Sequence, residues 1–369
     1  MLVEHAGWRP ECPPREEIMK YFLKSAATVG LLSVSTLSAQ ANTILIANEP
    51  GPNRGARAEA IEHLAQQISE RTNGEVTVEQ NWGGALFKSE AALASLSAGV
   101  ADMGVIIGSY AESEFPELQI GGLLLKPANT WVMMKAMYEL FTTNEYVKQR
   151  MDDMNIVYMQ PYSLSPQILA CRGEGIRSVA DIKGTKIAHT GASGDVFSVL
   201  GGNMVKMPIY DVFQGMETGL IDCSVTYAYF AVASNLNEKV DTMVDLRFST
   251  VTSLATFMNK FTFESLSEQE QEAILSIGPD LIDYYGESLE AADTKALETL
   301  QTGEYAVEFV DMPDADYAVL QEAAAPTIEK WKRDVATYGG DGDALLAELY
   351  ALMDKWTQVM ETEGLPWTR

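Results

Sequence analysis

The stretch "ILIANEPGPNRGARAEAIEHLAQQISERTNGEVTV", residues 44–78, shows how this chain begins to fold. Its first four residues are apolar and predict a buried strand, and the proline- and glycine-rich residues 48–53 predict a turn. From about Arg54 to Arg71, apolar residues recur with helical spacing, and Gly74 then supplies the left-handed conformation that commonly ends a helix. Residues 76–78 predict the next strand. A strand, a helix and a strand in this order predict a βαβ unit, and hence a parallel sheet.

The same alternation continues along the chain and then restarts. A helix is predicted over about 89–98 and a strand over 102–107. A second set of strands is predicted at 157–159, 167–170, 186–190, 204–207 and 221–225, with helices from 195 and over 210–218. The last part reads as helices over 267–300, about 314–337 and 342–363. The sequence therefore predicts an α/β protein with two units in tandem and a helical C-terminus.

The net charge, the small number of histidines and cysteines and the lack of catalytic motifs exclude several classes of function. The chain has 369 residues, with 52 acidic against 26 basic side chains and a net charge of −26, which disfavours nucleic acids and anionic membranes as partners. With three histidines and no Cys/His ligand spacing, no metal site is expected. No cofactor fingerprint occurs, and the "GASG" at 191–194 lacks the glycine at Asp195 that a nucleophile elbow needs. We therefore predict no catalytic residues, no cofactor and no enzyme activity.

The N-terminus predicts export. A basic start at Met19–Lys24, an apolar run over 25–37 and the A-x-A pattern Ala39–Ala41 predict a signal peptide over 19–41, cleaved after Ala41. Residues 1–18 are interpreted as a mis-annotated upstream segment. The mature protein is expected in the periplasm, where Cys171 and Cys223 could pair, although spacing alone leaves this open.

Three stretches together carry a family resemblance. They are "NGEVTVEQNWGGALFKSEAALASLSAGVADMGV" (73–105), "IRSVADIKGTKI" (176–187) and "LGGNMVKMPIYDVFQGMETGLIDCSV" (200–225). In this order, behind a signal peptide, they resemble the periplasmic solute-binding subunit of tripartite ATP-independent periplasmic (TRAP) transporters, the DctP-like family.

The resemblance implies a type II periplasmic-binding-protein fold, in which two α/β lobes joined by a long helix close over a ligand. Residues 42–164 with about 255–310 would form the first lobe, and 165–254 with the C-terminal helices the second. The protein would capture a small organic solute, such as an organic, aromatic or sulfonic acid, and deliver it to a TRAP membrane permease. The alternative is a binding component of an ATP-driven importer or a sensor module. A monomer is expected, with a dimer as the alternative.

The sequence departs from the family at the residue that usually holds the ligand. Most members carry an arginine two residues after the lysine of "DIKG-K", where it binds the ligand carboxylate, but here Ala188 and His189 follow Lys186-Ile187. Three explanations stay open. Arg172 could supply the charge, the turn 191–194 could hold the anion with His189 and Ser193, or the ligand is not a simple carboxylate.

Other predicted ligand-binding residues follow the ends of strands. Trp82 precedes Gly83-Gly84 after the second strand, where the family lines its pocket. Thr226 is the nearest match to a ligand-binding asparagine of the family, and Tyr227 and Tyr229 follow it and suit a flat ligand. Asn48 and Glu49, at the end of the first strand, complete the predicted set. Arg54 and Arg57 begin the first helix near the cleft mouth and are interpreted as solvated.

Overall fold

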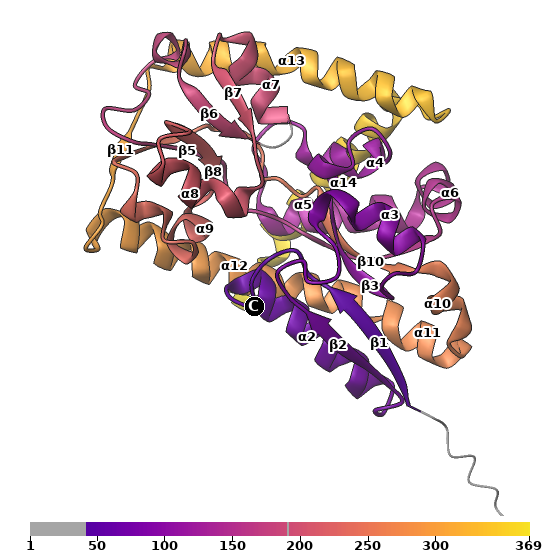
Figure 1. The fold of residues 1–369 in the computed structure, drawn as a ribbon. Coiled ribbons are helices and arrows are strands. Elements are labelled where there is room, and N and C mark those ends of the chain that lie inside the picture. The colour runs from indigo at the N-terminus through magenta and orange to yellow at the C-terminus, as the bar shows by residue number, and fades with distance from the viewer. Residues whose placement is uncertain (1–41, 190–191) are drawn as a thin grey trace, which may run out of the picture. The chain divides into compact units, whose positions relative to one another are not determined.

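The computed structural model describes residues 42–189 and 192–369, and the part from Asn42 to Arg369 is one compact unit built on two sheets (Figure 1). The predicted signal peptide, the upstream segment and turn residues 190–191 lie outside the described residues. The α/β fold class and the helical C-terminus are confirmed. In the described part of the chain, every helix is too short or too polar to cross a membrane.

The first sheet contains the predicted βαβ unit. Its strand order is β2-β1-β3-β10-β4, with bounds Val76–Asn81, Thr43–Asn48, Met103–Ile107, Leu254–Asn259 and Ile156–Tyr162. Strand β1 pairs in parallel with β2 and β3, whereas β10 runs antiparallel to β3 and β4. Helix α2 (Ala56–Arg71) connects β1 to β2 and buries one apolar face, formed by Ala56, Ala58, Ala60, Ile61, Leu64 and Ile68.

The second sheet has the order β11-β9-β5-β8-β6-β7. Its strands are Glu308–Val310, Thr242–Asp245, Ile168–Cys171, Cys223–Thr226, Lys186–His189 and Asn203–Lys206. Strand β6 pairs in parallel with β7 and β8, while β5 is antiparallel to β8 and β9. The helices between these strands are α7 (Ala192–Val199), α8 (Val212–Glu217) and α9 (Ala228–Ala233).

Shorter helices complete the two halves. The α-helices are α3 (Ala92–Ser97), α4 (Pro116–Gln119), α5 (Thr130–Thr143), α6 (Glu145–Asp153), α10 (Lys260–Ser265) and α11 (Glu268–Leu275). The 3₁₀ turns are η1 (Ser89–Ala91), η2 (Gly108–Tyr110), η3 (Ile120–Gly122), η4 (Val179–Ile182), η5 (Ile209–Asp211), η6 (Leu236–Glu238) and η7 (Pro366–Thr368). The predicted helix over 89–98 is thus a 3₁₀ turn followed by a short α-helix.

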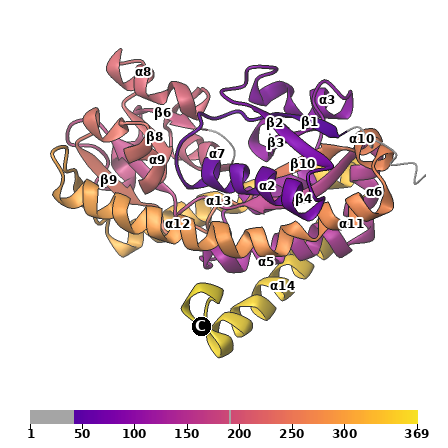
Figure 2. The same ribbon diagram turned by 90° about the horizontal axis from the view of Figure 1, so that it is seen from below.

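Two extended segments and one long helix connect the sheets. Residues 163–167 lead from β4 to β5, and residues 246–253 lead back from β9 to β10. The segments hold each other through the Leu164 amide on the Val251 carbonyl (2.8 Å) and the Ser163 and Thr252 hydroxyls (2.9 Å). Helix α12 (Ile277–Thr302) runs beneath both halves and packs on α2, α5 and α9 (Figure 2). Each of these segments links the two sheets covalently.

The C-terminal helices pack on different halves. Helix α13 (Asp314–Thr337) packs on α7 and also reaches α4, and helix α14 (Gly342–Glu363) packs on α5 (Figure 1). Helix α5 lies in the chain between β3 and β4 of the first sheet, so α14 packs beside that sheet. The assignment of the C-terminal helices to the second lobe stays a prediction. The apolar stripe of α14 is directed partly into this contact, with Leu345, Leu349 and Met353 buried.

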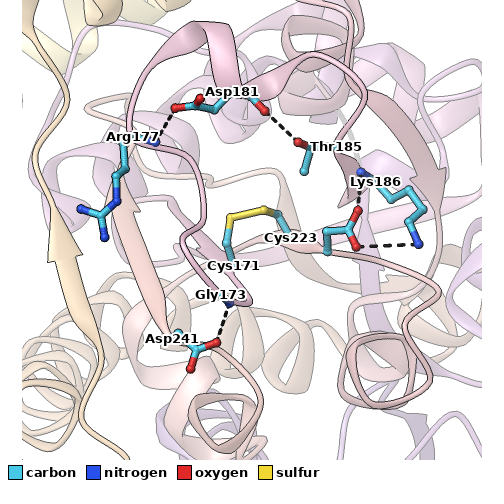
Figure 3. The surroundings of a disulfide bond; sticks show 9 residues. Cys171, Gly173, Arg177, Asp181, Thr185, Lys186, Cys223 and Asp241 are labelled. Carbon is cyan, nitrogen blue, oxygen red and sulfur yellow. Dashed lines mark hydrogen bonds and ion pairs between the residues drawn. A yellow bond between two sulfur atoms is a disulfide. The ribbon is translucent and has the colours of Figure 1, made fainter.

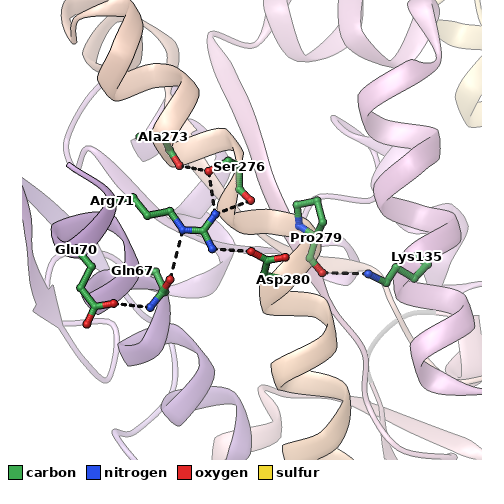
Figure 4. Close-up of polar contacts among 8 residues, drawn as sticks. All are labelled: Gln67, Glu70, Arg71, Lys135, Ala273, Ser276, Pro279 and Asp280. Atoms are coloured by element: carbon green, nitrogen blue, oxygen red, sulfur yellow. Dashed lines mark hydrogen bonds and ion pairs between the residues drawn. The ribbon is translucent and has the colours of Figure 1, made fainter. Parts of the chain in front are cut away.

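Helix α2 is fixed at its C-terminal end (Figure 4). The Arg71 guanidinium donates to the Ser276 hydroxyl and carbonyl (2.8 and 2.9 Å) and pairs with Asp280 at 2.6 Å. On the neighbouring helix, Lys135 donates to the Pro279 carbonyl at 3.0 Å. The Arg71 contacts tie the C-terminal end of α2 to the start of α12, and the Lys135 contact ties α5 to the same place.

A disulfide joins the two central strands of the second sheet (Figure 3). Cys171 and Cys223 are directly opposite each other on β5 and β8, and each is 1% exposed. The pairing that the sequence left open is therefore formed in the structure. Strand β8 ends at Thr226, and Tyr227 follows it directly.

Candidate functional site

A large cavity lies between the two halves, at the N-terminal end of α2. Its volume is about 570 Å³. The loops after β1 and β2 form one wall, and η5, α8 and α9 form the other. The aromatic lining residues are Trp82, Tyr210, Phe213, Tyr227, Tyr229 and Phe230, and the charged ones are Glu49, Arg54, Arg57, Lys88, Glu90 and Asp211. We call this space the outer chamber.

A smaller cavity of about 80 Å³ continues from the outer chamber toward the ends of the strands. Both spaces are lined by Arg57, Ile209, Tyr210 and Tyr227, so the two meet at these side chains. We call the smaller space the inner compartment. Its amide and aliphatic hydroxyl side chains are Ser109, Gln119, Gln167, Ser193, Thr226 and Ser253, and Tyr110, Tyr210 and Tyr227 add phenolic hydroxyls. Among the described residues that line it, Arg57 is the only charged one.

Arg57 stands at the junction of the two spaces. It is the second residue of α2 and follows Gly55, whose positive φ of 84° directs the chain from the loop into the helix. Its Nη2 donates to the Tyr210 hydroxyl at 2.6 Å, which links α2 of the first half to η5 of the second. A side chain at Gly51 would not fit here, because a Cβ would lie 2.6 Å from that hydroxyl. The half-buried guanidinium is thus held in place, with donors left for a ligand.

Glu49 lies next to Arg57 in the wall of the outer chamber and is 2% exposed. Among the described residues, its Oε2 has no hydrogen-bond partner. Burial raises the pKa of Glu49 to about 8, although the nearby Arg57 acts in the opposite direction. At neutral pH this side chain is therefore mostly a neutral acid, so it leaves the positive charge of Arg57 largely uncompensated.

An aromatic wall faces Arg57 and Glu49. The rings of Tyr227 and Tyr229 lie 4.9 Å apart, and Phe230 lies 5.4 Å from Tyr227 and 5.9 Å from Tyr210. Burial raises the pKa of both Tyr227 and Tyr229. The phenols therefore remain neutral at physiological pH, and the wall presents ring faces and hydroxyl groups rather than charges.

The structure brings most of the predicted residues together. Glu49, Trp82, Tyr227 and Tyr229 line the outer chamber, and Ser193, Thr226 and again Tyr227 line the inner compartment. Ser193 donates its hydroxyl hydrogen to Gln167 Oε1.

Three predicted residues lie elsewhere. Arg172 is exposed, donates to the Met216 carbonyl at 3.1 Å and lines neither cavity, because β5 ends before it and its side chain follows the surface. His189, at the end of β6, lies against Gly194 of α7 and also lines neither. The Asn48 side chain is engaged with the loop after β2, accepting from the Leu86 amide (3.0 Å) and donating to the Phe87 carbonyl (3.1 Å). The predicted anion-binding turn 191–194 begins at Gly191, which lies outside the described residues.

Sequence reasoning missed four residues of the site. Arg57 was expected to be solvated, but it is half-buried and lines both spaces. Tyr210, Gln119 and Gln167 were not among the predicted residues. The position of Arg57 two residues after a glycine at a helix start was the available signal. Within the described residues, no cluster of histidine, cysteine or acidic side chains could hold a metal ion.

Comparison with known proteins places this chain in a family. Residues 48–334 match the DctP family model, described as bacterial extracellular solute-binding protein, family 7. A solute-binding protein of Albidiferax ferrireducens is 25% identical over 307 residues, which cover 80% of this chain and 85% of that protein.

Two solved structures share the fold. One is a TRAP periplasmic solute-binding protein from Bordetella bronchiseptica with bound (R)- and (S)-mandelate, with a TM-score of 0.75 at 20% identity over 85% of this chain and 99% of that one. The other is a TRAP solute-binding protein from Rhodoferax ferrireducens in complex with copurified benzoate, with a TM-score of 0.75 at 19% identity over 86% and 99%. The predicted resemblance is confirmed: this chain belongs to the DctP family, family 7 of the bacterial extracellular solute-binding proteins.

Proposed function

We propose that this protein captures an aromatic carboxylate in the periplasm and delivers it to a TRAP permease, without catalysing a reaction. The observation that carries the proposal is the position of Arg57 opposite an aromatic wall; among the described residues it is the only charged side chain that lines both spaces. A guanidinium binds a carboxylate through two parallel hydrogen bonds, and aromatic faces bind a flat apolar ring. Arg57 would thus replace the arginine that the family carries where this chain has Ala188.

The size and polarity of the outer chamber support this ligand class. A volume of about 570 Å³ falls within the range of small-molecule sites, which combine apolar walls with a few polar anchors. The fold neighbours with mandelate and benzoate show that this fold accommodates aromatic monocarboxylates. A neutral polyol would bind less favourably, because it would leave the charge of Arg57 unpaired in a half-buried site.

Ligand capture would proceed by closure of the two halves. The ligand would interact with Arg57 and Trp82 on the first half and with Tyr227 and Tyr229 on the second. Since these contacts form together only when the halves are close, ligand binding would favour the closed form. The permease would then recognise that form.

The test is isothermal titration calorimetry of the mature protein with benzoate, phenylacetate, benzenesulfonate and an uncharged sugar alcohol. We expect the aromatic carboxylates to bind, and Arg57→Met to weaken them by roughly 10- to 100-fold, the usual worth of a hydrogen bond to a charged group.

Arg172→Met is the matched control, because it removes the same charge from outside both cavities and should leave affinity unchanged. If Arg172→Met weakens binding and Arg57→Met does not, the proposed anchor is wrong. If only the sulfonate or the sugar alcohol binds the wild-type protein, the proposed ligand class is wrong.

A further inference from the structure

The inner compartment contains buried polar groups that the protein itself leaves unused. Among the described residues, Thr226 Oγ1, Gln167 Nε2 and Gln119 Oε1 have no hydrogen-bond partner. Their residues are 2%, 4% and 6% exposed, so bulk water does not solvate them freely. A buried polar group without a partner costs free energy, and native proteins rarely keep three in one place unless something binds there.

The three groups come from different parts of the fold and meet at one cavity. Thr226 ends β8, Gln167 precedes β5, and Gln119 ends α4 in the other half. Gln167 is held in position because its Oε1 accepts the Ser193 hydroxyl, which leaves its amide nitrogen as a donor. Together they offer an amide donor, an amide acceptor and a hydroxyl that can do either.

The charges around the compartment restrict what it can receive. Arg57 is its only charged lining residue among those described, and under the proposed function Arg57 is already paired with the ligand carboxylate. A second carboxylate would face the carbonyl oxygen of Gln119, which repels it. Among the described lining residues there is no second positively charged side chain to bind it. An ammonium group would lie near Arg57 without an acidic side chain in the lining. An uncharged group that both donates and accepts hydrogen bonds fits all three unused atoms.

We infer that the inner compartment is a second ligand subsite, which receives a hydroxyl group carried on the carbon next to the carboxylate held by Arg57. This inference rests on the proposed function and narrows its ligand class to aromatic 2-hydroxy acids. The carboxylate is bound at the junction, the ring lies in the outer chamber, and the hydroxyl contacts Thr226 and Gln167 in the inner compartment.

The test uses four ligands that differ only at that carbon: phenylacetate, mandelate, phenylmalonate and phenylglycine, which carry hydrogen, hydroxyl, carboxylate and ammonium. Dissociation constants are measured by calorimetry. We expect mandelate to bind roughly tenfold more tightly than phenylacetate, as one or two net hydrogen bonds would give. Phenylmalonate and phenylglycine should bind no more tightly than phenylacetate.

The variant Thr226→Val keeps the shape of the side chain and removes only its hydroxyl. We expect the ratio of the phenylacetate to the mandelate dissociation constant to fall several-fold. Folding should not suffer, because the hydroxyl has no partner among the described residues, and the melting temperature checks this.

Thr250→Val is the matched control, since Thr250 is also buried, with an unpartnered hydroxyl in the described part of the chain, and lines neither cavity. If phenylacetate and mandelate bind equally well, or if Thr226→Val leaves their ratio unchanged, the subsite is refuted while the proposed function stands. If none of the four ligands binds, the proposed function fails and this inference fails with it.

Discussion

Two neighbouring side chains, Arg57 and Glu49, determine the electrostatics of the site. The protein has a net charge of −26, which opposes the approach of an anion, so the local positive charge must come from few groups. Burial keeps Glu49 largely protonated at neutral pH. Arg57 can therefore act on a carboxylate with nearly its full charge.

This arrangement predicts that the stability of the fold and the binding of an anionic ligand both depend on pH through the ionisation of Glu49. Its pKa is raised from 4.5 to about 8 in the folded protein, so the folded state retains a proton that the unfolded state releases. The free energy of unfolding should therefore fall as pH rises between about 4.5 and 8, by a total on the order of a few kcal/mol. Binding of an anionic ligand should weaken above about pH 8, where Glu49 becomes charged.

Glu49→Gln keeps the size of the side chain and cannot ionise. Denaturant unfolding and ligand titration from pH 5 to 9 should show that both pH dependences are reduced in this variant. Equal slopes for the wild type and the variant would mean that Glu49 does not hold a proton in this range.

At the scale of the elements, the site depends on how one helix and one strand are fixed. Helix α2 is held at one end by the contacts of its Arg71 with Ser276 and Asp280, and it carries Arg57 at the other. Strand β8 is held to β5 by the disulfide and carries Thr226 at its end. Both walls of the site are thus supported by contacts outside the cavities.

Reduction of the disulfide should destabilise the whole protein. The cysteines are 52 residues apart, and closing a loop of this length restricts the unfolded chain by about 4 kcal/mol in the chain-entropy description. We expect dithiothreitol under conditions that reduce the bond to lower the melting temperature measured by circular dichroism. The double variant Cys171→Ala, Cys223→Ala should melt at a lower temperature and should not respond to the reductant. A wild type that melts identically with and without its disulfide would contradict this.

At the scale of the whole molecule, the contact between Arg57 and Tyr210 joins the two halves across the cavity. Removing the hydroxyl in Tyr210→Phe should shift the ligand-free protein toward a more open form, with a change in the equilibrium of roughly tenfold for a hydrogen bond to a charged group. Small-angle X-ray scattering would detect this as a larger radius of gyration. Tyr338→Phe is the control, because its hydroxyl donates to the Ser113 carbonyl away from both cavities. No difference between Tyr210→Phe and the wild type would show that this contact does not hold the halves together.

The sequence predicted local structure better than it predicted the site. Helix α14 was expected over 342–363 and has these bounds, because the spacing of its apolar residues is a property of the segment itself. The predicted helix over 267–300 is interrupted at Ser276, where α11 ends and α12 begins. Arg57 was missed because its partner Tyr210 is 153 residues away, and no local pattern reports such a contact. Arg172, offered as a replacement for the missing arginine, follows directly after strand β5 and lines neither cavity.

Trp82 gives the molecule a built-in optical reporter. It lines the outer chamber, whereas the other tryptophans of the described chain, Trp131, Trp331, Trp356 and Trp367, line neither cavity. An aromatic ligand that stacks near its indole should change the intensity or wavelength of its emission, while the other four indoles supply a constant background. Occupancy could then be followed in real time on the unlabelled protein, and Trp82→Phe should abolish the signal. The rate of ligand release to a reconstituted permease would become measurable by fluorescence alone.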